Sequence, residues 1–164
     1  MNREKKNELQ ISENPKQSPQ DDCLQNRQAQ LGQTLDMAIG IVRIAAENRG
    51  QGILLLDLTG QTALFDYFVI VTGASRRQLV AMSTEIDRSM KERFNERKLS
   101  ISGFEDGRWI ILDYGSIVVH LFDEDTRQFY DLESLWGDAK EVDISSVVTQ
   151  ASLHMARLGN SSGS

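Results

Sequence analysis

Two six-residue runs near the middle of the chain are apolar at every position except Asp113 and His120. The first run is Trp109–Tyr114, the second is Ile117–Phe122, and only Gly115-Ser116 separates them. Two apolar runs joined by a Gly-Ser pair predict a β-hairpin with a type II′ turn. That turn sets these pairs of facing residues: Trp109–Phe122, Ile111–His120, Leu112–Val119, Asp113–Val118 and Tyr114–Ile117.

Because successive side chains of a strand point to opposite sides, those of the hairpin divide between two faces of the predicted sheet. One face is wholly apolar and suits a core: Ile110, Leu112, Tyr114, Ile117, Val119 and Leu121. The other face mixes apolar residues with one acid and one imidazole: Trp109, Ile111, Asp113, Val118, His120 and Phe122. Because such mixed surfaces are typical of protein–protein contacts, we expect this face to be exposed and to bind another protein.

Two longer segments show helical periodicity. Apolar residues recur three or four positions apart from Leu31 to Ala46, which predicts a first helix that ends near Gly50. Ser75 and Gln78 form a capping box, which predicts a second helix from about Arg76. The expected buried stripe of this second helix is Leu79, Met82, Ile86, Met90 and Phe94.

Further strands are expected at 53–59, 65–72 and 100–103. The segment 65–72 is apolar on both sides apart from Asp66, which is typical of a central strand that is covered on both faces. Residues 125–136 are expected to form a short helical or turn segment. The resulting order α-β-β-α-β-β-β-α predicts a mixed sheet with packed helices, an α+β or layered α/β fold.

The ends of the chain differ in composition from its middle. Residues 1–26 are rich in Asn, Gln, Lys and Glu and have few large apolar groups, so we expect a disordered tail. Residues 27–143 are expected to form one binding domain. Residues 144–164, which end in a run of Gly, Asn and Ser, are expected to be a flexible tail.

The chain is acidic, with 24 Asp and Glu against 18 Lys and Arg and a formal charge of −6. This balance argues against direct, sequence-specific nucleic-acid binding but allows docking on a basic protein. Cys23 is the single cysteine, so an internal disulfide is impossible and a reducing, cytoplasmic compartment fits. We expect no membrane span, signal peptide or transit peptide.

Carboxylates on the expected strands are the first candidates for catalysis. Asp57, Asp66 and Asp113 would have to gather around metal ions to support phosphoryl transfer. None of them has an acidic partner one residue away, so a structural or interface role is favoured. His120 and His154 lack companions at metal-ligand spacing. We therefore expect no catalytic residue, no metal and no cofactor.

Two tryptophans are open to different interpretations. Trp136 is expected to pack in a core, because with Leu132 and Leu135 it forms an apolar edge that can dock there. Trp109 suits either a core or a binding centre, because its strand already has a complete apolar face without it and tryptophan is favoured at binding centres.

Four segments, taken in order, resemble the ribosomal silencing factor (Iojap-like) family. They are Asp66–Gly73, Ser75–Gln78, Trp109–Phe122 and Arg127–Trp136. They follow a DYFVI-x-TG strand, a S-x-x-Q helix start, a W-x-x-x-D-x-G-x-x-V-V-H hairpin and an R-x-x-Y-x-L-E-x-L-W terminus. The likeness spans about residues 31–139. Ser102 and Ser116 depart from the family pattern, which usually has acids there.

The resemblance implies a five-stranded sheet of nucleotidyltransferase-like topology without catalytic acids. It implies binding of the large ribosomal subunit through ribosomal protein L-fourteen, a steric block to subunit joining, repressed translation and a tendency to form homodimers. A divergent nucleotidyltransferase acting on a small nucleotide is the alternative. The residues that we expect to bind the partner are Asp66, Tyr67, Trp109, Ile111, Asp113, His120, Tyr130 and Leu132.

Overall fold

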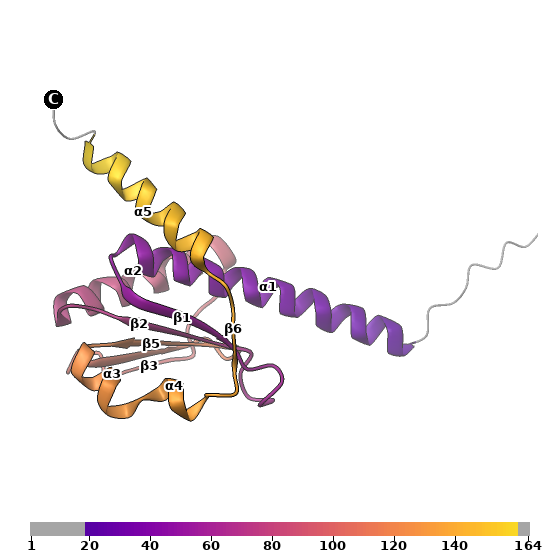
Figure 1. Cartoon of the computed structure of the whole chain (residues 1–164). Coiled ribbons are helices and arrows are strands. Elements are labelled where there is room, and N and C mark those ends of the chain that lie inside the picture. Colours follow the sequence, from indigo (N-terminus) through magenta and orange to yellow (C-terminus); the bar gives the residue numbers. More distant parts are fainter. Residues whose placement is uncertain (1–18, 161–164) are drawn as a thin grey trace, which may run out of the picture.

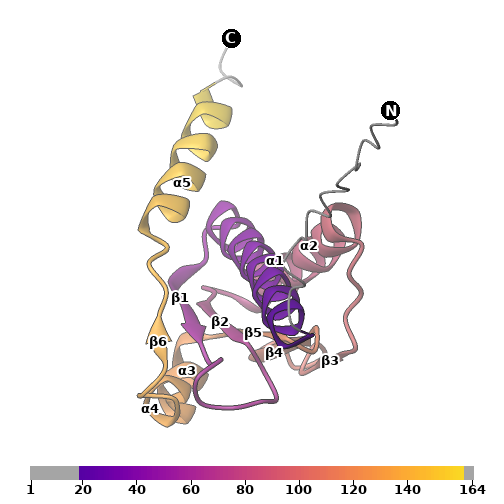
Figure 2. The ribbon, with the colours of Figure 1, turned by 90° about the vertical axis from the view of Figure 1, so that its right-hand side faces the viewer.

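The computed structural model describes residues 19–160, which form a single mixed sheet with helices on both faces (Figures 1 and 2). The strands are β1 (Gln51–Asp57), β2 (Tyr67–Thr72), β3 (Ser100–Ser102), β4 (Trp109–Asp113), β5 (Ile117–Phe122) and β6 (Lys140–Glu141). The helices are α1 (Pro19–Glu47), α2 (Arg76–Phe94), α3 (Glu124–Tyr130), α4 (Leu132–Leu135) and α5 (Ser145–Asn160). The predicted α+β class is confirmed.

The sheet has the order β3-β4-β5-β2-β1-β6. Its central pair, β2 and β5, is parallel, and the other neighbours are antiparallel. Helices α1 and α2 cover one face, whereas α3 and α4 lie on the other (Figure 2). The structure has six strands where we expected five, because β6, a pair of charged residues, adds to the outer edge of β1. Two residues are too few to show a period-2 pattern.

The hairpin forms in the predicted register, with Trp109 opposite Phe122 and Asp113 opposite Val118. Gly115 has φ +82°, as the first central residue of a type II′ turn requires, and Ser116 has no positive φ. The capping box is also present in part: Ser75 Oγ accepts a hydrogen bond from Gln78 N, and α2 begins at Arg76. The reciprocal bond differs, since Gln78 Oε1 accepts from Ala74 N.

The apolar face of the hairpin lies in the main core, between the sheet and α1 and α2. The mixed face was expected to be exposed, and that prediction is wrong for most of it. Val118, His120 and Phe122 are buried in a second, smaller core on the face that carries α3 and α4. The reason is that α4 and the turn after it bring Leu132 and Trp136 onto that face, which local alternation does not reveal.

Both expected tails are shorter than predicted within the part of the chain that the structure describes. Residues 19–26 belong to α1, because extending a helix that has already formed costs little free energy per residue. Residues 1–18 of the expected tail lie outside the part of the chain that the structure describes. Residues 145–160 form α5 rather than a flexible segment. Val147, Val148 and Ala151 share one side of α5 and pack on the main core or beside α1.

Candidate protein-binding site

An aromatic cluster lies where β4 begins and α3 ends. The ring of Trp109 lies 4.8 Å from that of Phe122, in a stacked arrangement, and 4.8 Å from that of Tyr130. Phe122 is fully buried, Trp109 is half-buried, and Tyr130 is 55% exposed. The cluster therefore runs from the second core to the surface, so its outer rings are held in place by buried ones.

His120 supports this cluster from the neighbouring strand. Its Nδ1 accepts a hydrogen bond of 3.3 Å from Nε1 of Trp109, and it packs edge-on against Phe68. Burial lowers the pKa of His120 to about 4, so the imidazole is neutral near pH 7. A neutral ring that accepts at Nδ1 carries its proton on Nε2, which is buried and has no partner in the described part of the chain.

Capping positions α3 and α4 beside the cluster. Asp123 caps α3 by accepting from Thr126 N at 2.7 Å, and it pairs with Arg108 at 3.0 Å. Burial alone would raise the pKa of Asp123, but the bonds from Thr126 and Arg108 lower it. At the other end Asp131, in the left-handed region at φ 43°, ends α3 and lets α4 begin at once.

Arg127 ties α3 to the sheet, and sequence reasoning did not single it out. Its Nε binds Glu133 Oε1 at 2.6 Å, and its Nη1 donates to Gly52 O and to Thr72 Oγ1, both at 2.7 Å. The Arg127 side chain is largely buried, so these bonds compensate a charge that has lost its water. The only sequence signal was its place in the R-x-x-Y-x-L-E segment, a motif that specifies both Arg127 and Glu133.

The exposed part of the site combines aromatic rings with charged groups. Phe129 is 81% exposed and was not among the expected residues. Leu135, which we expected to dock in a core with Trp136, is 74% exposed instead, whereas Trp136 packs on the second core. A hollow of about 550 Å³ is lined by Trp109, Phe129 and Tyr130 together with polar groups from the 103–108 loop and α3. Two consecutive aromatic residues in a short helix cannot both face its core, which is the signal that could have pointed to Phe129.

Gly103 brings the loop that borders this hollow against β4. It has φ +71°, and a Cβ at this position would lie 1.9 Å from the carbonyl oxygen of Trp109. Only glycine allows both that conformation and that approach. The loop and the Trp109 backbone are therefore held together at the rim of the site.

The structure brings some of the expected residues together and separates others. Ile111 and Leu132 pack with Trp109 in the second core, so they support the site from beneath. Asp66, Tyr67 and Asp113 lie at the opposite end of the strands. Tyr67 is buried in the main core, where desolvation and the nearby Asp57 and Asp66 raise its pKa.

The strand carboxylates do not assemble into a metal site. Asp57 accepts from Thr59, and Asp113 Oδ1 accepts from Gly115 N at 2.7 Å, so each stabilises a local turn. Two strands, β2 and β5, separate the strands that carry them, a spacing of ~14 Å. Within residues 19–160 no group of three or more His, Cys, Asp or Glu is placed to hold a metal ion. Nor is any described helix both long and apolar enough to cross a membrane.

Fold and site together define an α+β domain with an exposed aromatic surface held on a rigid base. A family model described as ribosomal silencing factor during starvation matches residues 32–161. The chain belongs to this family. The ribosomal silencing factor of Bacillus subtilis is 39% identical over 111 residues, which cover 63% of this chain and 91% of that protein.

A more distant relative and two solved structures are also similar to this chain. The chloroplast protein Iojap of Zea mays is 27% identical over 110 residues, 67% of this chain and 47% of its own length. A crystal structure of a Chromobacterium violaceum protein is similar with TM-score 0.56 at 34% identity, covering 60% of this chain and 83% of its own. A crystal structure from Bacillus halodurans is similar with TM-score 0.57 at 29% identity, and the match covers 67% of this chain and 96% of that chain. The names of the relatives support a ribosome-associated silencing role.

Proposed function

We propose that this protein binds the large ribosomal subunit through ribosomal protein L-fourteen and blocks joining of the small subunit by occupying the space beside it, so that translation in the cytoplasm is repressed. The observation that carries the proposal is the exposed surface of Trp109, Phe129 and Tyr130 above a packed base. Aromatic anchors in a hollow are the usual energetic centres of protein interfaces.

The charges around the hollow fit a basic partner. Asp106 and Asp125 line it, and Arg108, the cation that also lines it, is paired with Asp123. The chain as a whole carries a formal charge of −6. An acidic surface attracts a basic protein and speeds their encounter, whereas it repels the phosphates of RNA. A protein component of the ribosome is therefore a better partner for this surface than its RNA.

The relatives support the subunit assignment by name. A mouse relative, 31% identical over 105 residues, is called mitochondrial assembly of ribosomal large subunit protein 1. Steric blocking requires only affinity and bulk, so no catalytic group or cofactor enters the mechanism. This agrees with strand carboxylates that stabilise turns.

A homodimer is part of the same proposal. The mixed sheet face, which we expected to bind another protein, is largely buried, so two copies would meet through the exposed aromatic surface. Two copies that meet there would compete with the ribosome for the same rings. Sedimentation equilibrium of the free protein, repeated with Phe129→Ala, tests this: the variant is expected to shift toward monomer.

Calorimetric titration with purified L-fourteen tests the partner assignment. We expect saturable binding by the wild-type chain and at least tenfold weaker binding by Phe129→Ala. Undiminished binding by that variant would place the contact elsewhere on the domain. A parallel incubation with nucleoside triphosphates and Mg²⁺ tests the nucleotidyltransferase alternative, for which we expect no turnover.

A further inference from the structure

The strand β3 forms an open edge of the sheet on the side opposite β6. It pairs with β4 alone, and all three of its residues are exposed. The backbone N–H and C=O groups that point away from β4 have no strand partner within residues 19–160. Such an edge is a ready template for one more strand.

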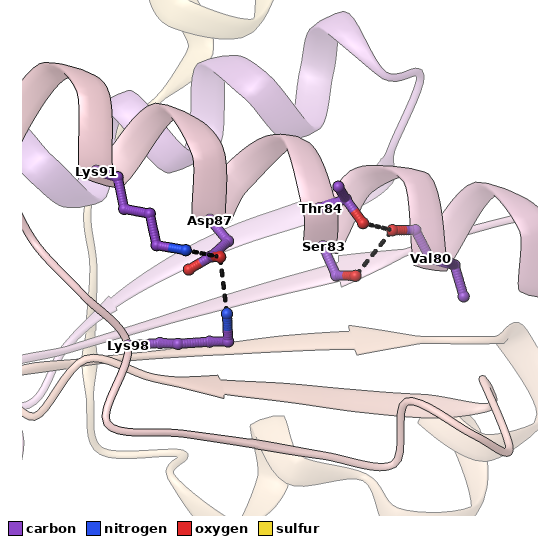
Figure 3. A network of polar contacts seen from close by, with 6 residues as sticks. All are labelled: Val80, Ser83, Thr84, Asp87, Lys91 and Lys98. Carbon is purple, nitrogen blue, oxygen red and sulfur yellow. Dashed lines mark hydrogen bonds and ion pairs between the residues drawn. The ribbon is translucent and has the colours of Figure 1, made fainter.

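Helix α2 runs alongside this edge and forms a groove with it. The hollow has a volume of about 660 Å³. It is lined by Ser83, Thr84 and Asp87 of α2, by Lys98 just before β3, by Ile101 of β3, by Leu112 of β4 and by residues of the 103–106 loop. Figure 3 shows the polar side of the groove, with Asp87 reaching from α2 toward Lys98, just before β3. A strand edge beside a helix is the geometry that peptide-binding domains use to accept an extended peptide.

Asp87 organises the polar side of the groove. Lys91 and Lys98 both donate to its Oδ2, each at 2.7 Å, so the carboxylate already has two cationic partners, and its Oδ1 is buried. Burial alone would raise the pKa of Asp87, but the bonds from the two lysines lower it, so the carboxylate is ionised. Ser83 and Thr84 both donate to Val80 O, which leaves their hydroxyl oxygens able to accept (Figure 3).

The rim of the groove adds apolar surface and negative charge. Leu99, Ile101 and Phe104 are exposed around the strand. Glu105 and Asp106 are exposed at the end of the groove, and no cation of residues 19–160 lies within ion-pair distance of either. The side chain of Arg76 fixes this loop by donating to the backbone oxygen of Glu105 at 2.7 Å, so the loop that carries both acids is held in place.

We propose that β3 accepts an added strand from a partner protein, an extended segment that alternates apolar with lysine or arginine side chains. Its main chain would pair with the free edge of β3. Its apolar side chains would pack on Ile101 and Phe104, and its cations would meet Glu105 and Asp106, the exposed acids of the rim. This site lies on the α2 face of the sheet and shares only Gly103 and Asp106 with the aromatic hollow. The proposal does not depend on the proposed function.

Nuclear magnetic resonance titration of the ¹⁵N-labelled full chain tests the proposal. The probes are a panel of acetylated and amidated heptapeptides that alternate lysine with valine, isoleucine or leucine. Their matched controls have the same composition with every second amide N-methylated, which removes strand hydrogen bonds but keeps the charge. We expect saturable shifts at residues 83–87 and 100–106 with the probes and at least tenfold weaker binding of the controls.

Variants of the chain make the test specific. Glu105→Lys and Ile101→Lys are both changes at exposed positions, and each is expected to weaken binding at least tenfold. Asp138→Lys, an equally exposed acid outside the groove, is the matched control and is expected to bind like the wild type. Circular dichroism confirms that each variant is folded.

Three results would overturn the proposal. Equal binding of the N-methylated peptides would reduce the contact to nonspecific charge attraction. Failure of the whole panel to bind would remove the extended basic segment as the occupant. Self-association of the free chain that Ile101→Lys abolishes would assign the edge to a second copy of this chain instead.

Discussion

Nε1 of Trp109 donates a hydrogen bond of 3.3 Å to Nδ1 of His120, which joins neighbouring strands β4 and β5 on the face that carries α3. The bond fixes the indole of Trp109 against Phe122 and beneath Tyr130. A buried, neutral histidine thus orients the aromatic ring at the base of the binding surface.

Replacing Trp109 separates packing from hydrogen bonding. Trp109→Phe keeps a ring against Phe122 but loses the donor, so we expect a loss of about 1 kcal/mol in the free energy of unfolding. Trp109→Ala also opens a cavity and is expected to cost about 2–4 kcal/mol and to weaken large-subunit binding roughly thirtyfold. Urea unfolding and co-sedimentation of the same preparations measure both. An alanine variant that melts early yet binds normally when folded would make Trp109 a core residue only.

His120 makes stability sensitive to acid. Its pKa is about 4 in the folded chain and about 6.5 when unfolded, so below pH 6.5 the unfolded state takes up a proton that the folded state refuses. The free energy of unfolding should therefore fall between pH 6.5 and pH 4, by about 1–3 kcal/mol from this group. His120→Gln is expected to remove that share of the slope. Identical pH slopes for both proteins would contradict a buried neutral imidazole.

Phe129→Ala should reduce binding without reducing stability. The side chain is 81% exposed, so its removal leaves the free energy of unfolding within about 0.5 kcal/mol of the wild type. At the centre of an interface the same truncation costs about 2 kcal/mol or more. Leu64→Ala, at a position 76% exposed and far along the chain, is the matched control. Equal binding by the two variants, measured by co-sedimentation, would exclude Phe129 from the contact.

Arg127 should be critical for holding α3 on the sheet. Arg127→Met removes the bonds to Glu133, Gly52 and Thr72 and leaves the Glu133 carboxylate unpaired, so we expect a cost of about 3–5 kcal/mol. Glu133→Gln keeps an acceptor and is expected to cost about 1–2 kcal/mol. Thermal unfolding of both single variants and the double variant measures the coupling. Additive losses would mean that the pair is not energetically linked.

Local signals in the sequence were sufficient for the hairpin and for the start of α2. A Gly-Ser turn fixes the pairing of the strands on either side of it, and Ser75 acts within four residues of its target. The class of fold followed from the order of these elements. The same register placed Trp109 on the face opposite the main core, where it packs on the second core.

Long-range packing explains what sequence reasoning missed. Arg127 binds the carbonyl of Gly52, 75 positions earlier, and no local pattern indicates such a contact. Whether His120 is exposed depends on where Leu132 and Trp136 dock, which alternation within β5 does not record. The helix α5 was missed although Val147, Val148, Ala151 and Met155 recur at helical spacing, because the Gly, Asn and Ser residues at the end of the chain favoured a flexible segment.

The most direct test of the proposed mechanism is sucrose-gradient sedimentation of purified small and large subunits mixed with the protein. We expect the wild-type chain to migrate with free large subunits, to be scarce on joined ribosomes, and to lower the joined fraction as its concentration rises. Phe129→Ala should leave the joined fraction near that of the untreated mixture. Wild-type protein found equally on joined ribosomes and free large subunits would contradict a steric block to subunit joining.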